Sequence, residues 1–172
     1  MTAVASRSRM PEIALPEGFE SLPLPPGAAE QGASILGRFT AGDPPVSLAL
    51  AVGVAPLRAM PLPAVAIASS LVVPYRRRHP AAQVGVAMLA NGPALVALHA
   101  GEYRLPPEVA GAREELLLPR IRAEVQVPDG NRLVVVSVAG AGQDDWPAVI
   151  AEATRLAGSV GKGRGTRAER DR

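Results

Sequence analysis

The sequence predicts an α+β domain in which a mainly antiparallel β-sheet is covered by helices. Its 172 residues, 48% of them hydrophobic, are enough for one domain with a sizeable core. Several apolar segments have the length of strands and are bounded by glycine, proline or asparagine. Two longer segments instead space their apolar residues at the period of an α-helix.

The strands are predicted from alternation and from bounded apolar runs. In RIRAEVQV (120–127), four apolar residues point one way and Arg120, Arg122, Glu124 and Gln126 point the other, which indicates one buried and one wet face. The turn sequences NGP and PDGN favour hairpins. We predict a short edge strand in the proline-rich N-terminal segment and five further strands, over residues 46–54, 82–89, 94–103, 120–127 and 132–139.

A first helix is predicted over residues 64–79, because Ile67, Leu71 and Tyr75 recur at intervals of four. Pro74 is expected to kink this helix near its end. The run Arg76–Arg78 falls in the last turn, where exposed cations oppose the negative end of the helix dipole. Successive helical residues are about 100° apart, so three arginines in a row form a solvated collar rather than a phosphate cradle. The alternative is a basic spot that binds a partner.

A second helix is predicted over residues 144–160. Asp144 or Asp145 is expected to cap its first turn, Pro147 is tolerated there, and Gly161 is a suitable terminator. The predicted apolar stripe consists of Trp146, Val149, Ile150, Ala153, Leu156, Ala157 and Val160. Two weaker helical predictions are residues 28–39 and a turn around 108–115.

The basic charge is concentrated at the C-terminus. Residues 161–172 hold five basic and two acidic side chains, whereas the other 160 residues hold 13 and 14. Because a nucleic-acid-binding domain needs a basic face, we expect at most weak attraction through this tail. The composition divides the chain into a disordered N-terminus (1–10), a single α+β domain (11–160) and a basic disordered tail (161–172).

Groups that could carry chemistry are sparse. The absence of cysteine excludes disulfides and thiolate sites and fits a reducing cytoplasm. Two histidines, His79 and His99, do not supply the three or four converging ligands of a metal site. The glycines of VAGAGQDDW (138–146) precede two aspartates, which would repel a phosphate. Residues 59–75 are too short and too rich in proline for a membrane span. We therefore expect no metal, cofactor or membrane insertion.

Three stretches together resemble small actinobacterial proteins with the PsbP-like α/β/α sandwich fold. They are the strand–turn–strand–helix unit of 119–160, the helix–strand–NGPA–strand unit of 71–103, and LPEGFESL (15–22). Pro74 and the lack of a clear helix at 28–39 depart from that pattern. The resemblance implies a binding or assembly factor, and some of these proteins are associated with secretion systems or toxin neighbourhoods. It implies no catalytic residue, since its motifs are structural.

The leading hypothesis is a non-enzymatic protein, monomer or homodimer, that binds another protein. Arg120, Arg122 and Glu124 are the candidate surface, because they face away from one buried layer. The alternative is a small-ligand-binding protein or small hydrolase with a pocket near His99, Glu102 and Tyr103.

Overall fold

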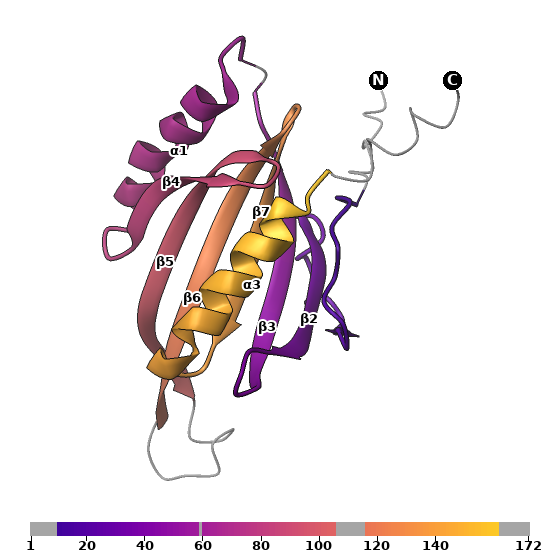
Figure 1. The fold of residues 1–172 in the computed structure, drawn as a ribbon, viewed down its shortest axis with the longest axis vertical. Helices are drawn as coiled ribbons and strands as arrows, with labels where there is room; N and C mark the ends of the chain where they lie inside the picture. The colour runs from indigo at the N-terminus through magenta and orange to yellow at the C-terminus, as the bar shows by residue number, and fades with distance from the viewer. Residues whose placement is uncertain (1–9, 59, 106–115, 162–172) are drawn as a thin grey trace, which may run out of the picture.

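The computed structural model of the chain describes residues 10–58, 60–105 and 116–161 and shows a mixed α+β fold (Figure 1). Seven strands form one antiparallel sheet in the order β1-β2-β3-β7-β6-β5-β4. The strands are β1 (Glu20–Ser21), β2 (Ala33–Ala41), β3 (Val46–Pro56), β4 (Gln83–Leu89), β5 (Gly92–Leu105), β6 (Leu116–Asp129) and β7 (Arg132–Gly140). The helices of the described residues are α1 (Ala64–Arg78), the short 3₁₀ turn η1 (Gln143–Asp145) and α3 (Trp146–Gly158). The predicted α+β class and mainly antiparallel sheet are confirmed.

The sheet consists of two antiparallel meanders that meet at β3 and β7. The first meander runs from β1 to β3, and the second runs from β4 to β7 and returns to the first. Val52 of β3 lies opposite Val136 of β7, so the two meanders join between residues that are far apart in sequence. Within the second meander, β6 and β7 pair around the turn at Gly130, as the sequence predicts.

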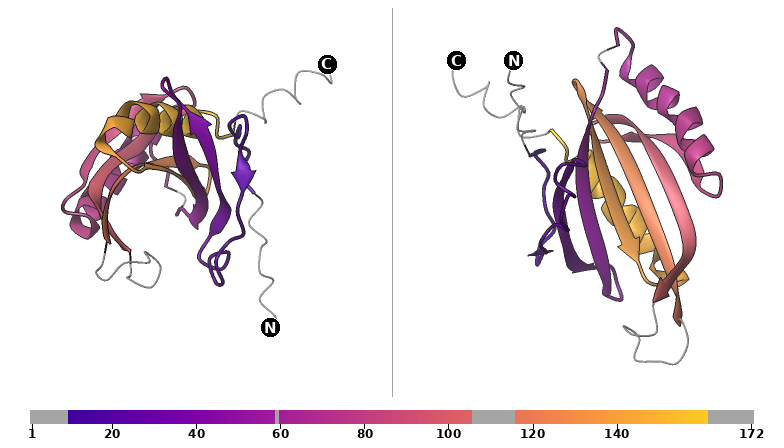
Figure 2. Two further views of the ribbon diagram at one scale, coloured as in Figure 1. Left: turned by 90° about the horizontal axis from the view of Figure 1, so that it is seen from below. Right: turned by 180° about the vertical axis from the view of Figure 1, so that it is seen from behind.

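The two helices lie on opposite faces of the sheet. Figure 2 shows the sheet bent into an arch with α3 on its outer side, and we call the face that points away from α3 the concave face. α1 packs on the concave face at the β4–β5 end, where Tyr75 contacts Leu95 and Ala97. α1 also reaches β6, whereas β2, β3 and β7 have no helix over their concave side in the described part of the chain (Figure 2).

The main core lies between the sheet and α3. Alternate residues of β7 point towards the helix, so Val134, Val136 and Val138 are fully buried. The α3 residues against the sheet recur at helical spacing and are Val149, Ala153, Leu156, Ala157 and Val160. Ile150, predicted in this stripe, is instead 37% exposed, because it falls outside the arc that meets the sheet. Trp146 is only partly buried, and its indole N–H donates to the side chain of Gln143.

Several local predictions can now be corrected or confirmed. Residues 28–39 were predicted to be helical, but a turn leads there into β2, whose pairing with both neighbouring strands outweighs a weak helical pattern. Asp145 does not cap the first turn of α3; its carboxylate accepts the preceding N–H groups of Ala141 and Gly142. Gly161 was predicted to terminate this helix, but α3 already ends at Gly158 with Ser159 as its C-cap, and Gly161 follows in the turn with φ of +78°.

The predicted domain limits are only partly covered by the structure. The domain predicted over 11–160 contains all the described helices and strands. The predicted N-terminus and basic tail fall almost entirely outside the described residues, as does the helical turn predicted around 108–115.

Candidate functional site

An open groove occupies the uncovered part of the concave face. It consists of two adjoining hollows, of about 430 Å³ and about 480 Å³, which share Leu36 as a lining residue. Both hollows lie over β2, β3 and β7, where α1 does not reach. We call these two hollows together the concave groove.

The floor of the concave groove is made of small side chains. On β3 the residues that face the groove are Ala49, Ala51 and Gly53, which alternate with the buried Leu48, Leu50 and Val52. Their partners across the strand pair are Ala139, Ser137 and Val135 of β7. Because these residues are short, they leave room above the sheet that large side chains would fill.

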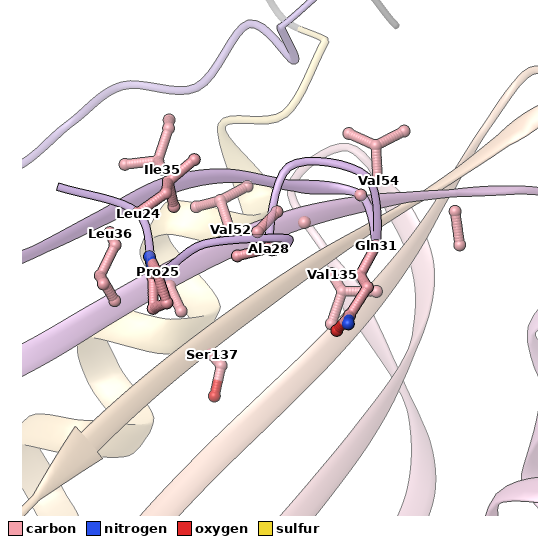
Figure 3. Close-up of a pocket in the computed structure, with 15 residues that line it drawn as sticks. Leu24, Pro25, Ala28, Gln31, Ile35, Leu36, Val52, Val54, Val135 and Ser137 are labelled. Atoms are coloured by element: carbon pink, nitrogen blue, oxygen red, sulfur yellow. The ribbon is translucent and has the colours of Figure 1, made fainter.

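The segment before β2 forms one wall of the first hollow. Figure 3 shows Leu24, Pro25 and Ala28 on this segment, with the side chain of Gln31 reaching towards Val135. Gly32 holds the segment close to the sheet: its φ is +91° and a Cβ there would lie 2.2 Å from the backbone oxygen of Val54. Only glycine fits at such a close approach, so the backbone at Gly32 fixes the position of this wall against the sheet.

The second hollow carries positive charge. It is lined by Arg38 and Arg120, together with Leu22, Ala49 and Ala139. Arg38 is paired with Glu20 of β1. Arg120 is exposed and has no ion-pair partner among the described residues. The groove is therefore apolar along its length with an arginine available at one end.

The three residues proposed as a binding surface lie on the concave face, but in different surroundings. Arg120 is exposed beside the groove. Arg122 and Glu124 lie closer to α1, and their side chains are 34% and 14% exposed. An Arg122 nitrogen is 3.7 Å from a Glu124 carboxylate oxygen, and Gln126 donates a hydrogen bond to that carboxylate. Of the three, Arg120 is the most accessible to a partner.

A cluster of rings fastens the end of α1 to the sheet. The hydroxyl of Tyr75 is 2.7 Å from Nε2 of His99 on β5. The His79 ring lies 4.5 Å from the Tyr75 ring and 5.4 Å from the His99 ring, measured between centroids. The sequence placed Tyr75 in the series at intervals of four that predicts this helix. It did not bring the three residues together, because only the packing of α1 on β5 joins them.

The protonation of this cluster follows from its burial. Burial raises the pKa of Tyr75 far above its usual value, and the nearby Glu124 carboxylate raises it further. Burial lowers the pKa of His99, with Arg122 acting in the same direction and Glu124 against it. Both rings are therefore neutral near pH 7, and the Tyr75 hydroxyl and Nε2 of His99 share a hydrogen bond. Since Tyr75 is only 1% exposed, this pair is placed to hold α1 rather than to meet a substrate.

A smaller hollow near His99 bears on the alternative hypothesis. It measures about 260 Å³ and is lined by His99, Glu102, Arg120 and Arg122 with two small residues. Nε2 of His99 is already engaged by Tyr75. The side chain of Tyr103 lies outside the described set. A ligand-binding or hydrolytic role for this hollow stays a prediction.

Among the described residues, no three histidine, aspartate or glutamate side chains gather where they could hold a metal ion. Within the same residues, no helix combines the length and the apolar character needed to cross a membrane. Comparison with models of known protein families finds none that matches the chain, and comparison with curated proteins likewise finds no match.

Proposed function

We propose that this is a non-enzymatic protein that binds another protein, and that the partner docks in the concave groove. The observation that carries the proposal is the uncovered apolar floor of the sheet, framed by Leu24, Leu36 and Val135. From Ser47 to Ala55 the floor follows β3 for about 27 Å at the usual rise of a strand. Its length and openness suit a segment of chain better than a small enclosed molecule.

The groove also indicates the chemistry of the segment that would fit it. A floor of alanine and glycine accepts bulky aliphatic side chains, whose burial supplies most of the binding energy. Arg120 at one end favours an acidic residue on the partner. This ion pair would orient the partner segment in the groove and speed its association. The proposed partner segment is therefore aliphatic along its length with an acidic residue at one end.

Filling the groove tests this function. Ala51→Trp places a large ring over the floor, and Ala151→Trp places the same ring on the exposed side of α3 as a matched control. Each protein carries a photoreactive crosslinker at the position of Ser47, and crosslinked partners from source-cell lysate are quantified by mass spectrometry. We expect one partner that the wild type and Ala151→Trp capture equally and Ala51→Trp captures at least tenfold less. Equal capture by all three proteins, or no captured partner, would overturn the proposal.

We also propose that the fold belongs to the PsbP-like α/β/α sandwiches and that the protein works in the cytoplasm. The support for the fold is the arrangement of α1 and α3 on opposite faces of one antiparallel sheet, together with the sequence motifs of 71–103 and 119–160. An experimental structure whose strand order differs from that of PsbP-like proteins would contradict the assignment.

The proposed cytoplasmic location is supported by the lack of cysteine, and fractionation of source cells checks it.

A further inference from the structure

The two edges of the sheet are built very differently. β1, at one edge, is two residues long, carries Glu20 in an ion pair, and is followed by prolines at positions 23, 25 and 26. Short length, charge and proline are the devices by which proteins prevent a sheet edge from pairing with another chain. β4, at the other edge, has seven residues, QVGVAML, with neither charge nor proline. Apart from Arg76 of α1, which bonds the backbone oxygen of Val84, this edge lacks the protection that the first one has.

The backbone of β4 offers hydrogen-bonding groups on its outer side. β4 and β5 are joined by a two-residue turn, with Leu89 opposite Gly92. In an antiparallel ladder counted from such a turn, Val84, Val86 and Met88 are the residues whose N–H and C=O groups point away from β5. The contact from Arg76 agrees with this count, because its guanidinium donates to the backbone oxygen of Val84. Pro93 agrees as well, since it lies opposite Met88, where no ladder N–H is required.

The side chains of β4 also leave its outer edge accessible. Val86 is 39% exposed and Met88 is 74% exposed. Gly85 is exposed, and a Cβ at that position would meet nothing within 4 Å. On the adjoining surface of α1, Val65 and Val73 are 51% and 56% exposed. They lie within about 80° of Arg76 around the helix, which is the side that reaches β4.

We propose that β4 pairs antiparallel with β4 of a second copy of this chain, so that the sheet continues across a two-fold axis near Val86. In that register Val86 lies opposite its counterpart and Val84 lies opposite Met88 of the other copy. The three outward residues of each strand then form three hydrogen-bonded pairs, in which the Val84 carbonyl accepts a second hydrogen bond besides the one from Arg76. The exposed Val86 and Met88 side chains become buried. A second copy fits this edge because the strand is uncharged and the two-fold places each Arg76 near Met88 of the other copy, away from the other Arg76.

This pairing is independent of the concave groove, which lies over the opposite half of the sheet. The exposed flank of α1 beside β4 enlarges the contact, since edge pairing alone buries less area than stable dimers require. The arrangement is isologous and closed, so it ends at two copies and does not propagate into a filament.

Oligomeric state in solution tests the proposal. Sedimentation velocity of the full chain should show a dimer of the 17.7 kDa protomer. Val86→Lys/Met88→Lys introduces charge into the edge and should raise the dimer dissociation constant at least tenfold, with an unchanged circular dichroism spectrum. Ile150→Lys is the matched control, since Ile150 is exposed to a similar degree on α3, and it should remain dimeric.

Because the chain contains no cysteine, a single introduced thiol reports the register directly. Val86→Cys should be joined to its counterpart by a short bis-maleimide crosslinker, whereas Ile150→Cys should not be joined. A wild type that stays monomeric at about 100 μM, or a double-lysine variant as dimeric as the wild type, would overturn the proposal. Equal crosslinking at the two cysteine positions would also overturn it.

Discussion

The two faces of the sheet use the same strands in opposite ways. On the α3 side, β7 presents Val134, Val136 and Val138, all fully buried. On the concave side, the same strand presents Val135, Ser137 and Ala139, and Val135 and Ser137 border the open groove. Among these residues, the α3 side of β7 is therefore all valine, whereas its other side, where no described helix packs, also carries the smaller serine and alanine.

This difference shows what determines burial in the molecule. Alternation along a strand sets which residues share a face, but a helix must pack on that face before its residues become a core. On the concave face, α1 supplies this cover over β4, β5 and part of β6, and Tyr75 and His99 hold it there. The concave face is thus half core and half surface, and the boundary between the halves lies beside Glu124.

The two faces should differ most in how much a substitution lowers the free energy of unfolding, and neighbouring residues of β3 show this difference. Leu50→Ala removes a fully buried side chain from the α3 side and should lower the free energy of unfolding by about 2–5 kcal/mol, because it leaves a cavity. Ala51→Ser, one residue further on and facing the groove, should change it by no more than about 0.5 kcal/mol. Urea denaturation of both variants measures the contrast, and similar losses would show that the concave face is as tightly packed as the other.

A smaller effect is expected where α1 is fastened to the concave face. Tyr75→Phe keeps the ring but removes the hydroxyl that bonds His99, so the free energy of unfolding should fall by about 1 kcal/mol. Ser70→Ala is the control, since the Ser70 hydroxyl bonds only the exposed backbone of its own helix. Thermal and urea unfolding report the two values. Equal effects would mean that the Tyr75–His99 bond adds nothing to the docking of α1.

The smallest expected effect is a pH dependence of the stability that the Tyr75–His99 contact contributes. The pKa of His99 is lowered in the folded protein, chiefly by burial, while Tyr75, His79, Arg122 and Glu124 face its ring. The unfolded chain therefore binds a proton first, at the ordinary value of about 6.5. The contribution of His99 to stability is complete above that pH and is lost as the pH falls through the lowered folded value.

Comparison of the wild type with His99→Gln measures this contribution. Glutamine can still hydrogen-bond the Tyr75 hydroxyl but does not titrate, so the variant should lose less stability than the wild type between about pH 7 and about pH 5. Urea midpoints at the two pH values give the difference. Parallel curves for the two proteins would exclude His99 as the titrating group.

Much of the fold could be predicted from local patterns. The strand over 120–127 and the helix that follows Asp145 have unambiguous periods, and both formed as predicted. β2 was mistaken for a helix, although Ile35, Gly37 and Phe39 do alternate and are buried. Its strand structure depends on pairing with β1 and β3, and a short alternating run next to an alanine-rich turn does not reveal that pairing.

The candidate site was much harder to predict. Arg120 could be assigned to the face opposite Ile121 from alternation alone, but nothing local says which strands lie beside β6 or where α1 stops covering them. The groove exists because β3 joins β7 across the centre of the sheet, and that pairing links residues some eighty positions apart. The meeting of Tyr75 with His99 likewise depends on the docking of α1.

The hydrogen bonds at the C-terminal end of α3 have a consequence for biosynthesis. The amide of Gly161 donates to the carbonyl of Glu12, and the amide of Ala14 donates to the hydroxyl of Ser159. Glu12 and Ala14 therefore acquire these partners only after α3 has left the ribosome, and the Ala14–Ser159 pair is separated by 145 residues. The segment before β1 can therefore settle only after α3 has been synthesised, so this part of the fold closes late during biosynthesis.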